Sequence, residues 1–255
     1  MKVALIQSAL VWENPQENRR VFTEKIAALA LDIDLIVLPE MFSSGFTMNP
    51  AAVAETMTGK TVLWMQKTAK SRHCAITGSL VITENGNFYN RLLFVFPSGE
   101  IQFYDKRHLF TLAGEEKIYT PGKQKLILEY MGWKICLLVC YDLRFPVFSR
   151  NIENYDLLIY VANWPEPRIL AWDSLLRARA IENLCYTIGV NRIGKDQNGM
   201  VYNGHSQLIG PTGDYVLTPL ETETTLVTTL QQNQVPQTRQ RFNFLNDRDV
   251  FEIKD

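Results

Sequence analysis

The sequence has almost no net charge, few cysteines and no long apolar run, and each of these shortages excludes a class of protein. The formal net charge is −1 over 255 residues, so the basic excess typical of a nucleic-acid-binding surface is missing. No apolar run approaches the roughly 20 residues that a membrane-spanning helix needs. We therefore expect neither a nucleic-acid partner nor a membrane partner.

The N-terminal segment lacks the features of a secretory signal. Residues 1–7 enter a strand-like pattern directly, and their apolar stretch is too short for the core of a signal peptide. This start predicts a cytoplasmic protein. Disulfides are rare in that compartment, so we expect the four cysteines, at positions 74, 136, 140 and 185, to be free.

The cysteine spacing does not predict a metal site. Cys136 and Cys140 are four residues apart on a predicted strand, which places them on one face about 13 Å from each other. No matching Cys/His pair follows to complete a tetrahedral site. Three of the thiols are therefore interpreted as small buried hydrophobic groups, and Cys140 is left for separate consideration.

No linker, composition break or internal repeat divides the chain. Its length and its 46% of apolar residues suit a single domain, 1–255, with one large core. The last segment, 231–255, is polar and glutamine-rich with spaced aromatic residues. Such a tail either frays or packs on a neighbour, and the aromatic residues favour packing on a second subunit of a homo-oligomer, a dimer or larger.

Strand-like and helix-like patterns alternate along the chain. Helices are predicted after the cap at Asn14, at 58–71, from Pro146 and at 168–183. Strands are predicted at 2–8, 35–38, 75–82, 88–96, 101–105, 125–130, 133–139, 156–162, 185–190, 205–210, 214–218 and 224–230. This order predicts an α/β fold in which two mixed sheets pack face to face under helices, a four-layer α-β-β-α sandwich.

Three apolar strands end in residues that carry chemistry. Glu40 follows 35–38, Lys106 follows 101–105, and Cys140 follows 133–139. Open α/β folds place ligands at such strand ends. A carboxylate can take a proton from a thiol, and an ammonium group, helped by the N–H of Tyr141, can stabilise an oxyanion. Taken singly, the same residues also fit a solvated acid, an exposed basic turn and a core cysteine.

The motifs around these residues resemble the nitrilase (carbon–nitrogen hydrolase) superfamily. They are Leu38-Pro39-Glu40, the run Asp-Lys-Arg-His-Leu-Phe at 105–110 and the run Val-Cys-Tyr-Asp-Leu-Arg-Phe-Pro at 139–146, and the resemblance covers nearly the whole chain. It implies a nitrilase-like fold, a catalytic Glu40–Lys106–Cys140 triad, a cysteine thioester intermediate and chemistry without a metal or organic cofactor.

The resemblance also implies a second glutamate upstream of a Pro-Gly pair. Glu115 and Glu116 both precede Pro121-Gly122. The spacing favours Glu115, with Glu116 as the alternative, and the implied role is to orient Lys106 and the reacting amide.

The run Tyr-Val-Ala-Asn-Trp-Pro at 160–165, together with 140–146, is similar to the omega-amidase branch of the YafV type. That branch implies hydrolysis of the terminal amide of 2-oxoglutaramate or 2-oxosuccinamate. A cation must then bind the free carboxylate of this small-molecule substrate, and Arg168 is the candidate, although it equally fits a surface position. Phe46, Tyr141 and Trp164 are candidate apolar walls.

Other functions remain open at this stage. They are a nitrilase or an amidase for another small linear amide or nitrile, a glutaminase unit, and a non-catalytic relative. A nucleotide-binding protein is the alternative from a different class, because Gly59-Lys60-Thr61 is similar to the end of a phosphate-binding loop. Against it, Ala54 occupies the place of the first glycine.

Overall fold

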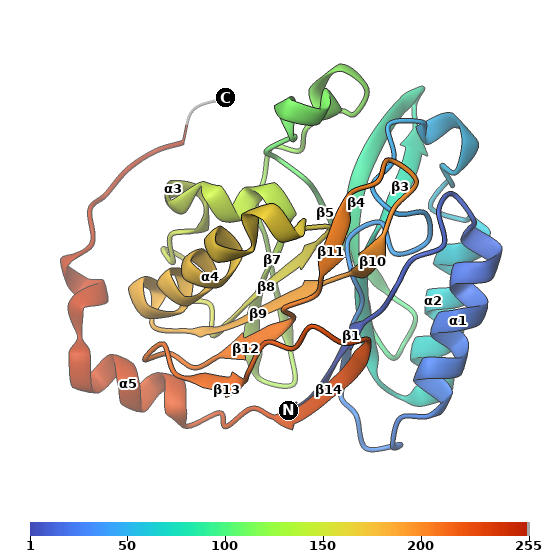
Figure 1. Cartoon of the computed structure of the whole chain (residues 1–255). Helices are drawn as coiled ribbons and strands as arrows, with labels where there is room; N and C mark the ends of the chain where they lie inside the picture. The colour runs from blue at the N-terminus through green and yellow to red at the C-terminus, as the bar shows by residue number, and fades with distance from the viewer. Residues whose placement is uncertain (254–255) are drawn as a thin grey trace.

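Two six-stranded sheets lie face to face in the computed structural model, which describes residues 1–253 (Figure 1). The first sheet has the strand order β14 (Thr224–Thr229), β1 (Lys2–Gln7), β2 (Leu35–Val37), β3 (Ala75–Glu84), β4 (Asn87–Val95) and β5 (Ile101–Asp105). The second has the order β13 (Tyr215–Leu217), β12 (Gln207–Ile209), β9 (Tyr186–Asn191), β8 (Leu157–Ala162), β7 (Trp133–Val139) and β6 (Leu126–Tyr130).

Helices cover the outer face of each sheet. α1 (Pro15–Ala27) and α2 (Lys60–Arg72) lie against the first sheet, and α3 (Pro146–Ser149) and α4 (Ile169–Asn183) lie against the second (Figure 1). This arrangement confirms the predicted four-layer α-β-β-α sandwich.

The strand directions bring several strand ends to one edge of the sandwich. β1, β2 and β3 are parallel, as are β7, β8 and β9, and the outer strands pair antiparallel. β5 runs in the same direction as β3, because two antiparallel pairings separate them. The residues that follow β2, β5, β7 and β8 are therefore placed to meet, as expected at the carboxyl ends of strands in α/β folds.

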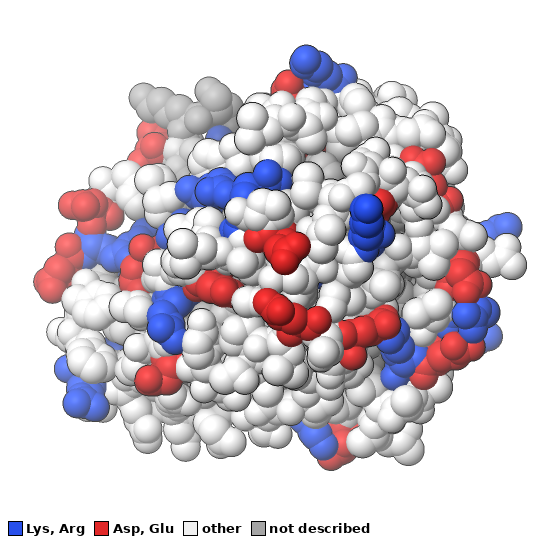
Figure 2. Space-filling view, in the orientation of Figure 1, with Lys and Arg blue, Asp and Glu red and all other residues white. Residues whose placement is uncertain are grey.

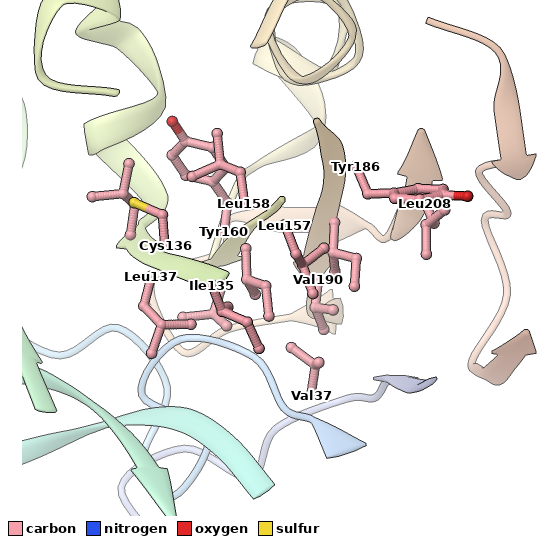
Figure 3. Packing of buried hydrophobic residues seen from close by; sticks show 14 of the residues in the cluster. Val37, Ile135, Cys136, Leu137, Leu157, Leu158, Tyr160, Tyr186, Val190 and Leu208 are labelled. Atoms are coloured by element: carbon pink, nitrogen blue, oxygen red, sulfur yellow. The ribbon is translucent and has the colours of Figure 1, made fainter. Parts of the chain in front are cut away.

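Both faces of the central strands are buried, which explains their unbroken apolar runs. On β1, Val3 and Leu5 pack in the core between the sheets, whereas Ala4 and Ile6 pack in the core under α1 and α2. Figure 3 shows Val37 of β2 pointing toward the side chains of the second sheet, among them Ile135. Because successive side chains of a strand point to opposite faces of the sheet, each one packs in one of these two apolar cores.

The first helix forms for the local reasons that the sequence indicates. Asn14 is the N-cap, and its side chain accepts a hydrogen bond of 3.1 Å from the N–H of Glu17. Pro15 occupies the first turn, and Phe22 and Ile26 are buried against the first sheet. α1 therefore begins where the cap predicts.

One hairpin was missed by the sequence patterns. β10 (Ile193–Lys195) and β11 (Val201–Asn203) form a separate two-stranded ribbon. The side chain of Asp196 closes its turn by accepting hydrogen bonds from the N–H groups of Asn198 and Met200, at 2.9 and 3.0 Å. The Asn198-Gly199 pair was the available signal, since Gly199 has a φ of +81°.

The C-terminal segment differs from the expectation that it frays or packs only on a neighbour. α5 (Gln234–Phe242) packs on its own domain, with Val235 buried. Arg239 donates hydrogen bonds to the carbonyl oxygens of Leu184 and Tyr155, at 3.2 and 2.5 Å. Packing of the rest of the tail on a second subunit stays a prediction, and positions 254 and 255 of the predicted tail lie outside the described residues.

The surface carries acidic and basic side chains mixed together on the face shown in Figure 2, and most of that face is uncharged. Among residues 1–253, no helix combines the length and the apolar character needed to cross a membrane.

Candidate active site

A cavity of about 160 Å³ opens at the carboxyl ends of the strands. Glu40, Lys106 and Cys140 line it together. Four residues predicted as substrate contacts also line it: Phe46, Tyr141, Trp164 and Arg168. The structure thus brings the three predicted strand-end groups and the predicted walls into one site.

Glu40 is held in a single orientation by donors from three segments. Its side chain is fully buried. Oε1 accepts hydrogen bonds from Asn90 Nδ2 at 2.8 Å and from Lys106 Nζ at 3.0 Å, and Oε2 accepts one from the backbone N–H of Asn163 at 2.8 Å. A buried carboxylate needs such partners, and charge-assisted hydrogen bonds are the strong ones. Glu40 is therefore fixed and remains in contact with the cavity.

The ammonium group of Lys106 is shared between two carboxylates. Nζ lies 3.0 Å from Glu40 Oε1 and 2.9 Å from Glu115 Oε2, and all three side chains are buried. Burial opposes the charge on Lys106, but Glu115 and Glu40 outweigh it and raise the pKa of Lys106 above its ordinary value. Lys106 is therefore a cation at neutral pH, although its side chain is buried.

Of the two candidate acids, Glu115 is the one that contacts Lys106. Glu115 is buried, whereas Glu116 is exposed. Glu115 Oε2 also accepts a hydrogen bond of 2.6 Å from the N–H of Phe110, which fixes the carboxylate. Burial and the nearby charge of Glu40 raise the pKa of Glu115, and Lys106 opposes that rise.

The Pro-Gly pair that pointed to Glu115 has a structural reason. Gly122 donates its N–H to the carbonyl oxygen of Lys106 at 3.0 Å. A side chain at this position would place its Cβ 2.0 Å from the carbonyl oxygen of Asp105. Only glycine permits this close approach, so Gly122 helps to hold the backbone of Lys106 in place.

Cys140 lies at the sharp turn where β7 ends and a 3-10 turn, Cys140–Arg144, begins. Its φ is +43°, a left-handed conformation that non-glycine residues rarely adopt and that typically costs about 1–3 kcal/mol. Burial and the charge of Glu40 raise the pKa of the thiol well above its ordinary value, with Lys106 opposing. The thiol is therefore protonated at rest and needs a base in order to attack.

The outer part of the cavity contains two arginines that lie on aromatic rings. The guanidinium of Arg168 is 5.3 Å from the ring centre of Phe110, and that of Arg144 is 4.8 Å from the ring centre of Trp164. Both arginines line the cavity and are partly exposed. Within residues 1–253, neither forms an ion pair with a carboxylate, so both are available to an anionic ligand.

Sequence reasoning missed several residues of the site. Asn90 and Asn163 hold Glu40, and Arg144 is a second cation at the cavity mouth. Asn163 and Arg144 lie in the runs 160–165 and 139–146 that carry the family resemblance, which was a usable signal for them. The hairpin contributes further lining residues that no local motif marks: Asp196, Asn198, Met200 and Tyr202.

The phosphate-loop alternative finds no support in the structure. Glu55 caps the N-terminus of α2, where its Oε2 accepts a hydrogen bond of 2.6 Å from the N–H of Thr61. A carboxylate therefore already occupies the place that a bound phosphate would need. The part of the chain that the structure describes also contains no group of three His, Cys, Asp or Glu side chains arranged to hold a metal ion.

Comparisons with known proteins agree with this geometry. A family model described as carbon-nitrogen hydrolase matches residues 2–240. The chain is 43% identical over 254 residues to omega-amidase YafV of Escherichia coli (strain K12), covering 99% of this chain and 98% of the relative. It is 32% identical over 216 residues to the 2-oxoglutaramate amidase of Bacillus subtilis (strain 168), covering 83% of each.

A solved structure shows the same fold. XC1258 from Xanthomonas campestris, a CN-hydrolase superfamily protein with an arsenic adduct in its active site, superposes with a TM-score of 0.97. The two sequences are 41% identical, and the match covers 100% of this chain and 99% of XC1258. The similarity thus extends over both sheets and the cavity between their strand ends.

Proposed function

The chain belongs to the carbon–nitrogen hydrolase family, and we propose that it is an omega-amidase. It hydrolyses the terminal amide of a short 2-oxo acid, 2-oxoglutaramate or 2-oxosuccinamate, to the dicarboxylate and ammonia. The observation that carries this proposal is a single cavity with Cys140, Lys106 and Glu40 at its floor and, at its mouth, two arginines that form no ion pair with an acid of residues 1–253. The relatives named omega-amidase and 2-oxoglutaramate amidase support the same substrate class.

The first half of the reaction forms a thioester. Glu40 takes the proton of the Cys140 thiol while the sulfur attacks the amide carbon. The ammonium of Lys106 and the N–H of Tyr141 stabilise the oxyanion. Tyr141 can donate its N–H because the first N–H groups of a helical turn have no hydrogen-bond acceptor within that turn. The C–N bond then breaks, and the nitrogen takes the proton from Glu40 and leaves as ammonia.

The second half releases the acid and restores the enzyme. Glu40 takes a proton from a water molecule, whose oxygen attacks the thioester carbon. The tetrahedral intermediate collapses by breaking the C–S bond, and the sulfur recovers its proton from Glu40. Glu115 contributes to both halves because its carboxylate, 2.9 Å from Lys106 Nζ, holds the ammonium group in place.

The mouth of the cavity selects the rest of the substrate. Guanidinium groups bind carboxylates through paired charge-assisted hydrogen bonds. Arg168 and Arg144 line the same cavity as Cys140, and we infer that they bind the carboxylate and the adjacent 2-oxo oxygen of a short chain whose amide reaches Cys140. Glutamine and asparagine carry an ammonium group in place of the 2-oxo group, and two nearby cations disfavour it.

The deciding experiment is a comparison of ammonia release from 2-oxoglutaramate, glutamine, asparagine and a simple aliphatic nitrile. We expect the 2-oxo acid amide to have the highest kcat/KM by a wide margin. Preferential turnover of the nitrile would identify a nitrilase instead. A higher kcat/KM for glutamine would identify a glutaminase and contradict the role given to the two arginines.

The proposal also places the protein in the cytoplasm as a homo-oligomer made of single carbon–nitrogen hydrolase domains. Exposed apolar side chains on the C-terminal segment, among them Phe242, Phe244 and Val250, support the assembly. Light scattering on the full chain tests it, and a monomer at micromolar concentration would contradict it.

A further inference from the structure

A buried carboxylate closes the turn that carries Cys140. Asp142 is fully buried, and its Oδ2 accepts a hydrogen bond of 2.9 Å from the N–H of Val139. The bond joins the residue before Cys140 to a side chain two residues after it. It therefore braces the left-handed backbone of Cys140, which would otherwise relax toward a more common conformation.

The same carboxylate binds the segment that carries Lys106. The hydroxyl of Tyr104 donates to Asp142 Oδ2 at 2.8 Å, and the N–H of His108 donates to Oδ1 at 3.0 Å. The ring Nδ1 of His108 faces Oδ1 at 2.8 Å, and it carries the proton because a carboxylate only accepts. Tyr104 and His108 are the residues two before and two after Lys106.

The directions of these hydrogen bonds are determined by neighbouring groups. Tyr104 accepts a hydrogen bond of 3.0 Å from the N–H of Arg107, so its own proton is donated to Asp142. The His108 ring stacks on Phe145, with centroids 3.8 Å apart and an interplanar angle of 6°. The stacking holds the imidazole in the plane that its hydrogen bond requires.

The two catalytic groups come from different sheets. Lys106 follows β5 of the first sheet, and Cys140 follows β7 of the second (Figure 1). The hydrophobic effect between the sheets is non-directional, so it does not by itself specify the distance between two particular groups. Hydrogen bonds have a narrow range of length and angle. A carboxylate that accepts from four donors in the two segments therefore adds directional constraints on their relative position.

We propose that Asp142, Tyr104 and His108 are positioning residues that set the distance between the Cys140 sulfur and the Lys106 ammonium. The inference rests on the proposed function, in which these two groups act on the same amide. Since a displacement of about 1 Å can cost 100-fold in rate, loosening this link lowers kcat without removing any group that contacts the substrate.

The test compares Tyr104→Phe with Tyr130→Phe. The Tyr130 hydroxyl donates to the carbonyl oxygen of Asp34 at 3.0 Å and so also links the two sheets. Neither Tyr130 nor Asp34 lines the cavity. We expect Tyr104→Phe to lower kcat about tenfold or more while KM changes less than about twofold. Tyr130→Phe should lower the melting temperature and leave kcat unchanged. Equal kcat values for the two variants would contradict the proposal.

A second pair of variants at the partly exposed His108 keeps the inference testable if Tyr104→Phe fails to fold. His108→Asn retains an N–H donor near Asp142, and His108→Leu has a similar size without a donor. We expect the asparagine variant to keep most of the kcat that the leucine variant loses. Equal losses in both would overturn the role of the hydrogen bond.

A crystallographic measurement separates failure of this inference from failure of the proposed function. The distance from Cys140 Sγ to Lys106 Nζ should differ between the wild type and Tyr104→Phe, or His108→Leu, by more than the coordinate error. This readout needs no substrate. An unchanged distance would contradict the positioning role even if omega-amidase activity is found. A changed distance would support that role even if another amide is the true substrate.

Discussion

The floor and the mouth of the cavity follow opposite rules. At the floor, Glu40 and Lys106 are buried and form an ion pair, and Lys106 forms a second ion pair with the buried Glu115. At the mouth, Arg144 and Arg168 are partly exposed and pair with no acid of residues 1–253. Charges that act on a transition state benefit from being held in advance. Charges that bind a ligand must keep their hydrogen bonds available for it.

Cys140→Ala tests the floor most severely. We expect it to abolish turnover, because no other thiol lines the cavity within the described chain, while the fold is retained. Cys136→Ala is the matched control, since Cys136 is a buried cysteine on β7, the strand that ends just before Cys140, and it does not line the cavity. It should lower stability only. A folded Cys140→Ala protein with full amidase activity would exclude the thioester mechanism.

Glu115→Gln should produce the next largest loss. It leaves Lys106 with one carboxylate partner in place of two, so the ammonium is less firmly held, and we expect kcat to fall by about 100-fold or more. Glu116→Gln is the control, because it makes the same substitution at the neighbouring, exposed residue. It should leave kcat unchanged. Steady-state kinetics on both variants check this, and similar kcat values for the two would refute the role of Glu115.

Changes at the mouth should act on binding. Arg168→Met and Arg144→Met should each raise KM for 2-oxoglutaramate by about 10-fold or more, with a smaller change in kcat, because a charge-assisted hydrogen bond contributes about 1.5–3 kcal/mol. Arg177→Met is the control, since Arg177 lies over the Tyr215 ring and does not line the cavity. A neutral amide of similar length should lose little affinity. Equal losses for both substrates would show that the arginines only shape the cavity.

The smallest expected effect is a shift in the pH dependence of Cys140 alkylation by iodoacetamide. Burial and the negative charge of Glu40 raise the pKa of the thiol, so in the wild type the alkylation rate should still increase above pH 8.5, the approximate pKa of a free cysteine. Glu40→Gln removes that negative charge and should shift the profile to lower pH while amidase activity falls. Mass spectrometry locates the alkylated cysteine. A wild-type midpoint below 8.5 would contradict the raised pKa of the Cys140 thiol.

Much of the site followed from local sequence. The apolar runs that end at Glu40, Lys106 and Cys140 indicated both the strands and the residues that follow them, because strand period and chain breaks at proline are properties of a few neighbouring residues. The family resemblance, through the spacing to Pro121-Gly122, favoured Glu115 over Glu116. The capped first helix and the α/β class could be predicted in the same way.

Other features depend on residues that are far apart in the sequence. Asn163 meets Glu40 across 123 positions, and Asp142 meets Tyr104 across 38. Such contacts depend on how one sheet lies on the other, and no short pattern encodes that. The packing of α5 was missed for the same reason, since its segment is polar and packs on surfaces supplied elsewhere in the chain. The hairpin at 193–203 is different, because the Asn198-Gly199 pair was a local signal that was overlooked.

The sequence alone therefore determined at which strand ends Glu40, Lys106 and Cys140 stand, because local periodicity and turn residues act over a few positions. That these residues carry the chemistry was implied by the resemblance of their motifs to the nitrilase superfamily. Only the tertiary structure decided that these groups line one cavity in which Lys106 is paired with Glu40, and that the two arginines at its mouth pair with no acid of the described residues 1–253. The physical reason is that hydrogen bonds and ion pairs require distances of about 3 Å, and only the packing of the two sheets creates such distances between segments so far apart in the chain.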